Sequence, residues 1–171
     1  MQQYLLVLDI GSTTVKFINV VSNSKQHFPE IRSSGVLPIS SDMVRDGEVL
    51  HPAALAADLK ARLKAAGVKT KYAALTVNSS RLILRQQNLP PLPIPQLKQL
   101  LNWELQRYTP YQSDTAEFDV LSIQLTPKHH TVLLAAVPKK IVASLFMTAQ
   151  LAGLSPLLLE PGIMCLFRWI Q

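Results

Sequence analysis

The chain has 171 residues, a mass of 19.0 kDa and a formal net charge of +6. Its hydrophobic fraction of 48% excludes a mainly disordered chain. The single cysteine, Cys165, excludes an internal disulfide framework and favours a reducing compartment. Because we find neither a basic secretory leader nor an apolar run long enough to span a membrane, we expect a cytoplasmic protein.

The N-terminal segment predicts three antiparallel strands. Residues 3–10 are strongly apolar and end at Gly11, and residues 14–21 alternate in polarity with many β-branched side chains. A short turn between them predicts a hairpin. A third strand is expected within residues 27–39, where Pro38 ends it.

A helix and a fourth strand follow. Asp46 and Gly47 form a turn signal. Pro52 suits the first turn of a helix, and Gly67 suits its C-terminal cap. Residues 72–78 then read as a strand. Three antiparallel strands, a helix and a parallel strand form the start of a ribonuclease-H-like layered domain, the core of actin, hexokinase and Hsp70 ATPase domains.

The next stretch predicts a separate small unit. Residues 81–87 form a short strand, and four prolines within residues 88–95 form an extended connector. A helix is expected over residues 94–108, with leucines along one face. Two strands, 118–125 and 131–137, form a hairpin. We interpret this strand-helix-strand-strand segment as an inserted subdomain.

The C-terminal stretch predicts a return to the main layer. Residues 140–151 form a helix that is apolar almost all round, so we expect it to be deeply buried. Residues 156–160 form a strand, and Pro161 starts a last helix. Its end, residues 167–170, is mostly apolar, which predicts a covering partner, a further domain or self-association.

The predicted architecture is therefore a mixed α/β domain. Residues 1–80 and 138–171 form the main domain, and residues 81–137 form the insertion. Nine cations and one anion lie between residues 60 and 107. Such a surface can bind nucleic acid or an anionic membrane. Because the cations alternate with apolar residues, we interpret them as a solvated face and expect neither a nucleic-acid partner nor direct membrane insertion.

The turn after the first strand has the chemistry of a phosphate site. Asp9 ends the strand, and Gly11 opens a turn that carries three hydroxyl side chains, those of Ser12, Thr13 and Thr14. Backbone N–H groups of such a turn can surround phosphate oxygens, and Lys16 can offset phosphate charge. Asp9 can hold water bound to Mg²⁺. The alternative interpretation is an ordinary hairpin turn.

Four stretches, residues 8–16, 44–50, 100–111 and 133–153, resemble the PilM family of actin-like type IV pilus assembly proteins, which is similar to the cell-division protein FtsA. The most specific part is W-E-x-x-x-Y-x-P-Y at residues 103–111, which generic actin-like ATPases lack. The likeness covers essentially the whole chain but only half the length of the family. The inserted subdomain corresponds to the family's 1C, or SHS2-like, subdomain.

The resemblance implies an ATP and Mg²⁺ site between two actin-like domains. Its first phosphate loop would be formed by Asp9, Gly11, Ser12, Thr13, Thr14 and Lys16. The second actin-like domain, with its own D-x-G turn and an adenosine-contacting motif, is not among these 171 residues. We therefore expect weak or undetectable ATP binding by this chain alone and no useful ATP hydrolysis. We predict no catalytic residue. Whether the chain is an enzyme stays open, and the sequence favours the answer that it is not.

The resemblance also implies a partner. PilM-like proteins form an adaptor ring at the pilus base, where a groove between the first subdomain and the insertion takes the cytoplasmic N-terminal tail of PilN, an inner-membrane protein. This would place the chain peripherally at the inner membrane. Trp103, Arg107, Tyr108 and Tyr111 are candidate groove residues, because aromatic and arginine side chains anchor many interfaces. Alternatively, they are core and cap residues of the inserted subdomain.

Three further residue groups bear on function, and two other functions stay open. His129 and His130 are adjacent in a hairpin turn and predict no metal site without other ligands. Cys165 is expected to be an inert packed thiol, and Glu160 to support the N-terminus of the last helix rather than to face a cleft. The alternative functions are the N-terminal lobe of an actin-like ATPase or sugar kinase, and the related adaptor of type II secretion.

Overall fold

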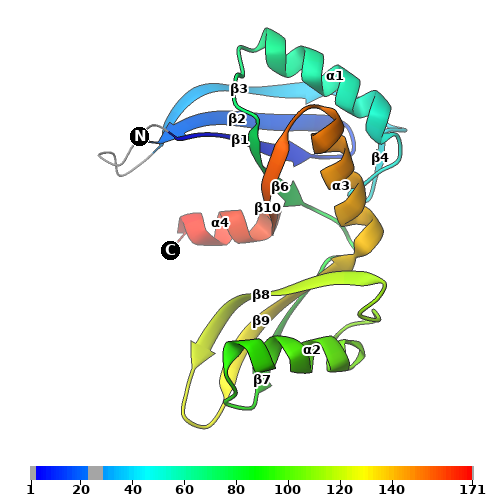
Figure 1. Cartoon of the computed structure of the whole chain (residues 1–171). Helices are drawn as coiled ribbons and strands as arrows, with labels where there is room; N and C mark the ends of the chain where they lie inside the picture. Colours follow the sequence, from blue (N-terminus) through cyan, green and yellow to red (C-terminus); the bar gives the residue numbers. More distant parts are fainter. Residues whose placement is uncertain (1–2, 23–28, 171) are drawn as a thin grey trace. The chain divides into compact units, whose positions relative to one another are not determined.

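The computed structural model describes residues 3–22 and 29–170, except for the side chains of Ser122 and Trp169. The first residues of the predicted third strand, from His27, lie outside this part. The chain divides into two compact units (Figure 1). Unit 1 consists of residues 1–80 and 141–171, and unit 2 of residues 81–140.

Unit 1 is built on a five-stranded sheet with the order β10-β6-β1-β2-β3. Its elements are β1 (Gln3–Ile10), β2 (Thr14–Ser22), β3 (Glu30–Pro38), β4 (Val44–Arg45), β5 (Glu48–Val49), α1 (Pro52–Ala65), β6 (Tyr72–Val77), α3 (Lys139–Leu151), β10 (Ser155–Pro161) and α4 (Gly162–Ile170). The first two residues of α3 belong to unit 2. β1, β2 and β3 pair antiparallel, whereas β6 pairs parallel with both β1 and β10. The predicted order of strands and crossover helix is confirmed.

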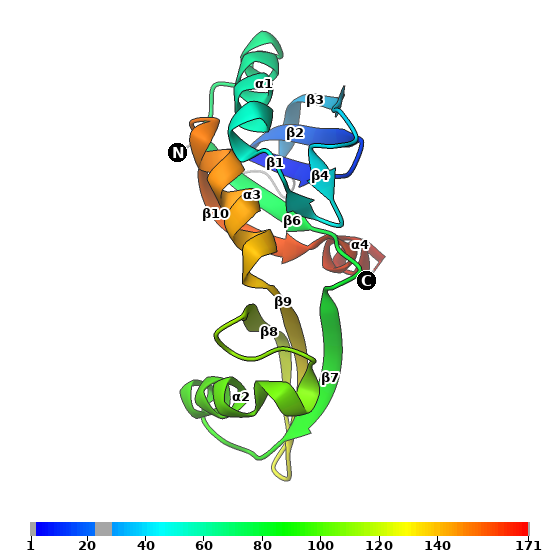
Figure 2. The ribbon, with the colours of Figure 1, turned by 90° about the vertical axis from the view of Figure 1, so that its right-hand side faces the viewer.

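One face of this sheet carries the core of unit 1. Leu6, Leu8 and Ile10 of β1 are buried at alternate positions, as expected for a strand with one face inward. The helices α1 and α3 cover that face (Figure 2). α1 supplies leucines four residues apart, so they form one helical stripe, and α3 supplies Ile141, Leu145 and Ala149.

The expectation that the helix at residues 140–151 is deeply buried is wrong. Met147 is 54% exposed and Leu151 is 51% exposed. Only the side of α3 that faces the sheet is covered, because α3 is an outer layer and not a central helix. The apolar composition of α3 therefore predicts more burial than the helix has.

The helix α4 lies near the other face of the sheet. It is on the opposite side of β10 from α3 (Figures 1 and 2). Ile163, Leu166, Phe167 and Ile170 on α4 are each more than half exposed. The apolar surface predicted at the end of the chain is therefore present. Self-association through this surface stays a prediction.

Unit 2 contains β7 (Ile83–Leu89), α2 (Ile94–Tyr108), β8 (Ala116–Leu125) and β9 (His130–Pro138). The three strands form an antiparallel sheet with the order β7-β9-β8. Leu97, Leu101 and Leu105 recur every four residues along α2 and pack in one cluster with Val132 and Leu134 of β9. Unit 2 therefore has a hydrophobic core of its own.

Candidate functional site

A row of polar side chains crosses four neighbouring strands of unit 1. Asp9 of β1 pairs in register with Lys16 of β2 and with Thr76 of β6, and Thr76 pairs with Glu160 of β10. Cross-strand partners point to the same face of a sheet. Four residues that are far apart in the sequence therefore lie side by side on the face opposite to α1 and α3.

Asp9 is the centre of this row. Its Oδ1 atom accepts hydrogen bonds from the Thr76 hydroxyl at 2.7 Å and from the Asn78 side-chain amide at 2.8 Å. Its Oδ2 atom lies 3.3 Å from the Lys16 ammonium group, and the Asp9 and Lys16 side chains are 30% and 61% exposed. The carboxylate is thus oriented by three side chains and remains partly open to solvent.

The turn between β1 and β2 is a hydrogen-bonded hairpin connection. The Gly11 N–H group donates to the Thr14 carbonyl oxygen at 2.9 Å, and the Ile39 N–H group donates to the Thr13 carbonyl oxygen at 2.9 Å. Ser12 and Thr13 are exposed. The amide of Gly11 is therefore used within the turn, while the hydroxyl groups of Ser12 and Thr13 remain accessible to a ligand.

A pocket of about 600 Å³ lies against this row. Its lining includes Asp9, Lys16, Thr76 and Asn78, together with four residues at the start of α4, Gly162, Ile163, Cys165 and Leu166. An added Cβ atom on Gly162 would collide with the Asn78 side chain, so glycine at this position lets Asn78 reach Asp9. Thr76, Asn78 and Gly162 were not predicted as site residues from the sequence. A usable signal was the polar Thr76 and Asn78 at the end of an otherwise apolar strand.

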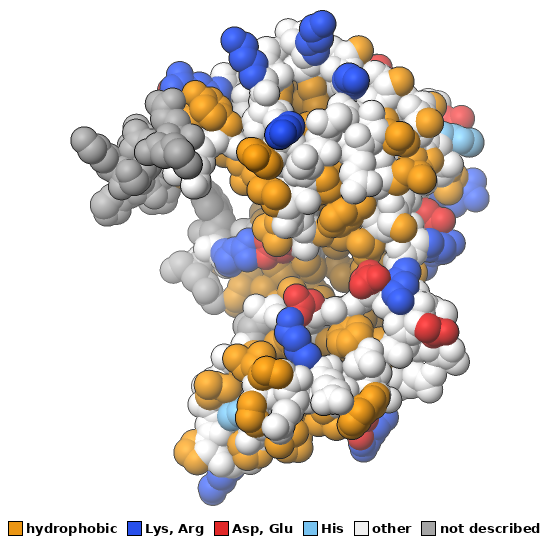
Figure 3. Space-filling model, in the orientation of Figure 1, with side chains coloured by type: hydrophobic (Ala, Val, Ile, Leu, Met, Phe, Trp, Pro, Cys, Tyr) orange, Lys and Arg blue, Asp and Glu red, His pale blue; other side chains and the backbone are white. Residues whose placement is uncertain are grey.

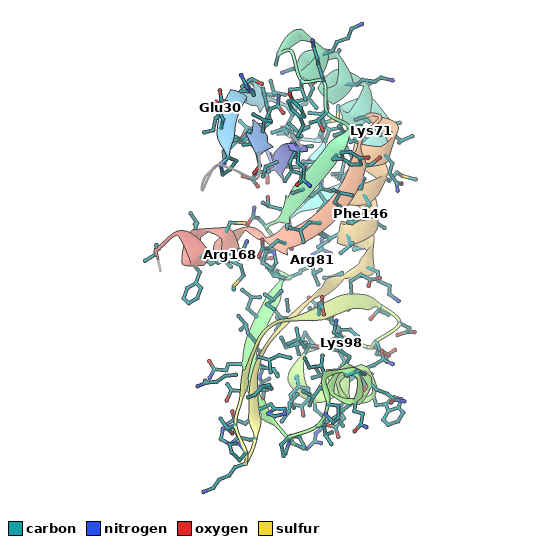
Figure 4. The ribbon with its side chains drawn as sticks, turned by 60° about the vertical axis from the view of Figure 1, so that its left-hand side comes forward. Glu30, Lys71, Arg81, Lys98, Phe146 and Arg168 are labelled. Carbon is teal, nitrogen blue, oxygen red and sulfur yellow. The ribbon has the colours of Figure 1, made fainter. Side chains whose placement is uncertain are left out.

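Glu160 faces the same side of the sheet as Asp9, and its side-chain contacts are with residues of the last helix, α4. Both of its carboxylate oxygens accept hydrogen bonds from the Arg168 guanidinium group, and the Cys165 thiol donates to it at 3.6 Å. Arg168 projects from α4 (Figure 4). The Glu160 carboxylate therefore links β10 to α4 through hydrogen bonds with side chains of α4.

The candidate groove residues of unit 2 separate into two kinds. Trp103 is 72% exposed and lines a polar pocket of about 370 Å³ with Asn102, Leu105, Gln106, Gln112, Ser113 and Asp114. The other three make internal contacts. Arg107 forms an ion pair with Glu104 at 2.7 Å, the Tyr108 hydroxyl donates to Glu104 at 3.1 Å, and the Tyr111 hydroxyl donates to the Arg81 carbonyl oxygen at 2.6 Å.

These contacts change the acidity of Tyr108. Burial and the neighbouring Glu104 carboxylate raise the pKa of the Tyr108 hydroxyl, because both disfavour a phenolate anion. Tyr108 and Tyr111 also pack against the hydrophobic core of unit 2. Trp103 and Arg107 are therefore the two candidates with mainly exposed side chains, at 72% and 69%. Of these two, Arg107 is paired with Glu104, whereas Trp103 lines the polar pocket.

The described residues hold neither a metal-binding cluster nor a membrane-spanning helix. Within residues 3–22 and 29–170, no group of three or more His, Cys, Asp and Glu side chains is arranged to hold a metal ion. His129 lies in the turn between β8 and β9, where its carbonyl oxygen accepts hydrogen bonds from Thr126. No helix in the same part of the chain is long and apolar enough to cross a membrane.

Comparison with known proteins identifies the family. The profile of the family described as type IV pilus assembly protein PilM matches residues 7–160. The chain belongs to this family. The match includes the polar row from Asp9 to Glu160 and the whole of unit 2. No curated protein sequence shows significant similarity to the chain.

Solved structures agree with the PilM family. A chain of the "PilM-PilN type IV pilus biogenesis complex" superposes with a TM-score of 0.78 and 26% identity, over 92% of this chain and 47% of that one. The cytoplasmic domain of EpsL, an inner-membrane component of the type II secretion system of Vibrio cholerae, superposes with a TM-score of 0.62 and 16% identity, over 93% of this chain and 57% of EpsL. The first match confirms the predicted actin-like fold, and the second shows a shared fold alone. The chain spans about half the length of these relatives.

The Cys165 thiol provides a direct probe of the Glu160 end of the polar row. Burial and the Glu160 carboxylate raise the pKa of this thiol, because both disfavour the thiolate. Since the thiolate is the reactive form, we expect Cys165 to react slowly with iodoacetamide near pH 8. Glu160→Gln removes the negative charge and should lower the thiol pKa and speed alkylation.

The measurement is the rate of alkylation against pH, followed by mass spectrometry. Glu117→Gln, an exposed position on β8, makes the same chemical change in unit 2 and should leave the rate unchanged. Equal rates in Glu160→Gln and the unsubstituted chain would show that Glu160 does not control this thiol.

Proposed function

We propose that this chain is an adaptor of type IV pilus assembly that binds the cytoplasmic N-terminal tail of a PilN-like inner-membrane protein. The observation that supports this most is the likeness to a PilM chain from a PilM–PilN complex over 92% of the residues. The adaptor would then lie on the cytoplasmic side of the inner membrane, held there by its partner. Other pilus assembly proteins are expected as further partners.

The polar pocket beside Trp103 has suitable chemistry for a peptide. Side-chain amides of Asn102, Gln106 and Gln112 line it, and amides can both donate to and accept from an extended peptide backbone. An exposed indole ring offers a large contact area at low entropic cost. We propose Trp103 as a peptide anchor, and Arg107, Tyr108 and Tyr111 as residues that shape the α2 end beside it.

The test is a calorimetric titration with a synthetic peptide. Its sequence is the cytoplasmic tail of the single-span membrane protein encoded next to this gene. We expect saturable one-to-one binding, and Trp103→Ala should weaken it by about 30-fold, the effect of an interface hot spot. Ile94→Ala serves as the control, because Ile94 is 49% exposed on the same helix and does not line the pocket.

Two results would contradict this proposal. If the unsubstituted chain does not bind the peptide, the adaptor function fails for this chain. If it binds but Trp103→Ala binds equally well, the partner contact lies elsewhere. A tail peptide from a type II secretion membrane protein, titrated in the same way, tests the related adaptor function. The EpsL-like fold supports that alternative by analogy alone.

We further propose that the polar row is one side of a phosphate site. Ser12 and Thr13 hydroxyls and the Lys16 ammonium group suit phosphate oxygens, and the partly exposed Asp9 carboxylate suits water bound to Mg²⁺. When bound, Mg-ATP would supply negative triphosphate charge that the Lys16 ammonium group would offset in part. The Gly11 amide is already engaged with Thr14 and Lys16 already pairs with Asp9, so part of the binding energy would go into breaking these contacts.

We therefore expect weak or undetectable Mg-ATP binding by this chain alone and no measurable hydrolysis. The measurement is isothermal titration with Mg-ATP, with Mg²⁺ alone as the blank. A micromolar dissociation constant would contradict the expectation and favour the alternative function, a lobe of an actin-like ATPase. In that case Asp9→Asn should abolish binding.

A further inference from the structure

Four lysines lie at one end of unit 1 and remain without an internal counter-charge. Lys60 and Lys64 are on α1, and Lys69 and Lys71 are in the connection to β6; all four side chains are exposed. Within the described residues none of them takes part in an ion pair. Arg62, the fifth cation of this stretch, is bonded to the Asp58 carboxylate and to the Pro38 carbonyl oxygen. We call the four lysines the lysine end.

The chain path explains why these lysines are neighbours. Lys60 and Lys64 are four residues apart on a helix, so they share one face. α1 ends at Ala65, and Gly67 takes a φ of +74°, a left-handed conformation that ends helices and reverses the chain. β6 then begins next to the last turns of α1. Figure 3 shows Lys and Arg side chains gathered over the part of the surface where α1 and the start of β6 lie in Figure 1.

The anions at this end of the sheet are engaged elsewhere. Asp58 is bonded to Arg62, and Glu30 forms an ion pair with Arg32 at 3.1 Å. Glu30 lies on β3, at the opposite edge of the sheet from β10, and Figure 4 shows it well apart from Lys71. The positive charge of the lysine end is therefore uncompensated.

An apolar pocket of about 730 Å³ adjoins the lysine end. Tyr4, Leu5, Tyr72 and Leu157 line it, and Lys69, Thr70 and Lys71 form its polar border with Gln3. Tyr4 is 45% exposed, Tyr72 is 47% exposed and Leu157 is 65% exposed. The Lys71 ammonium group lies 5.9 Å from the centre of the Tyr72 ring. Exposed leucine and tyrosine side chains thus stand directly beside unpaired ammonium groups.

The lysine end is separate from the polar row around Asp9. Tyr72 begins β6, whereas Thr76 and Asn78 are at or beyond its other end. With a rise of about 3.3 Å per strand residue, the two ends lie on the order of 20 Å apart. This is about two Debye lengths at physiological salt. The lysines therefore do not serve the phosphate-type turn.

We infer that the lysine end binds the surface of an anionic lipid bilayer. Ammonium groups at the ends of flexible side chains can contact lipid phosphates while tyrosine and leucine side chains enter the interfacial region. The apolar pocket favours lipid over nucleic acid, because binding to a duplex uses phosphate contacts that need no apolar surface. Single-strand sites stack bases on open aromatic faces, whereas the Lys71 ammonium group lies over the Tyr72 ring. The inference goes beyond the proposed function, since it adds a contact between this chain and the membrane that holds its partner.

Such a contact would be weak and reversible. Each lysine near an anionic membrane strengthens binding by about fivefold, and the effect falls off within a Debye length. Its use would be orientation: a chain held at the bilayer meets a membrane-anchored tail at a raised effective concentration. Neither the lysines nor the apolar pocket has to enter the hydrocarbon core for this role.

The test is co-sedimentation of the full chain with lipid vesicles, without any partner peptide. We expect binding to vesicles of phosphatidylglycerol and phosphatidylcholine, little binding to pure phosphatidylcholine, and a decline with added salt. Lys69→Glu/Lys71→Glu should weaken binding by about 30-fold or more, from the loss of two favourable lysine contacts. Lys69→Gln/Lys71→Gln should show an intermediate loss.

The matched control is Lys128→Glu/Lys139→Glu, which makes the same change in net charge at exposed positions of unit 2. It should keep most of the vesicle binding, and circular dichroism should show that all variants are folded. Equal binding to both vesicle types, or equal losses in the two charge-reversal variants, would overturn the inference. So would tighter binding to a DNA duplex that depends on the same two lysines. Because the lysine variants should bind the partner peptide normally, failure of this inference and failure of the adaptor proposal can be told apart.

Discussion

Replacing Leu101 with alanine is expected to destabilise unit 2 by about 3 kcal/mol, within the range measured for buried Leu→Ala substitutions. Leu101 is fully buried at the centre of α2 and packs in the cluster that includes Leu97, Leu105, Val132 and Leu134. The substitution removes three carbon atoms and leaves a cavity that a small core cannot easily close. Unit 2 has no disulfide to compensate, because the only cysteine is Cys165.

The measurement is hydrogen exchange by mass spectrometry together with chemical denaturation. We expect amides of residues 81–140 to lose protection in Leu101→Ala. Trp103→Ala is the matched control on the same helix, and because its side chain is 72% exposed it should change stability by only about 0.5 kcal/mol or less. A comparable loss in both variants would show that the α2 leucine stripe is not the core of this unit.

The two substitutions also separate stability from binding. Under the proposed function, Trp103→Ala keeps its fold and loses affinity for the partner peptide, whereas Leu101→Ala loses stability first. A variant that lost both together would indicate that Trp103 acts through the packing of α2.

Local patterns predicted most of the fold because most elements have a clear period or a clear stop signal. The leucines of α1 and α2 recur every four residues, and prolines and glycines mark most ends of elements. Two short strands could not be predicted in this way. The strands β4 and β5 have only two residues each, too short for any alternation to be visible, so that only the turn at Asp46 and Gly47 was predicted.

The candidate site was predictable in part. Asp9 and Lys16 lie close together in the sequence, so a hairpin already places them side by side. Thr76 and Glu160 join them only through the register of β1, β6 and β10, and register between parallel strands depends on how α1 and α3 pack. The same limit applies to Trp103, because sequence spacing does not tell whether an aromatic side chain on a helix is buried or exposed.

Gly47→Ala is expected to be the second strongly destabilising change, costing about 3 kcal/mol as strain and steric overlap combine. Asp46 and Gly47 have φ values of +47° and +81° and join β4 to β5 as a two-residue turn in which both central residues have positive φ, as in type I′. A Cβ atom on Gly47 would lie 2.5 Å from the Asn78 carbonyl oxygen and 3.1 Å from the Ser79 Cβ atom. A backbone oxygen cannot move away without shifting the strand end that carries it.

The turn is held against this strand end by Asp46. Its carboxylate accepts hydrogen bonds from the Ser80 N–H group at 2.6 Å and from the Ser80 hydroxyl at 2.9 Å. Relief of the overlap at Gly47 would therefore have to move residues 78–80. The Asn78 side chain holds Asp9, so the cost should extend from stability to the geometry of the polar row.

Gly67→Ala is the matched control, because it introduces the backbone strain of a positive φ without the steric overlap. Gly67 has a similar φ of +74°, but an added Cβ atom would meet nothing within 4 Å. It should therefore cost only about 1 kcal/mol, the backbone strain of a residue with a Cβ atom in the left-handed region. Chemical denaturation of the two variants measures the difference directly. If both lose the same amount, the approach of Gly47 to Asn78 has no energetic role, and the turn is not what fixes the end of β6. If Gly47→Ala loses clearly more, the hairpin of β4 and β5 is a support of the strand end that positions Asn78 and, through it, the Asp9 carboxylate.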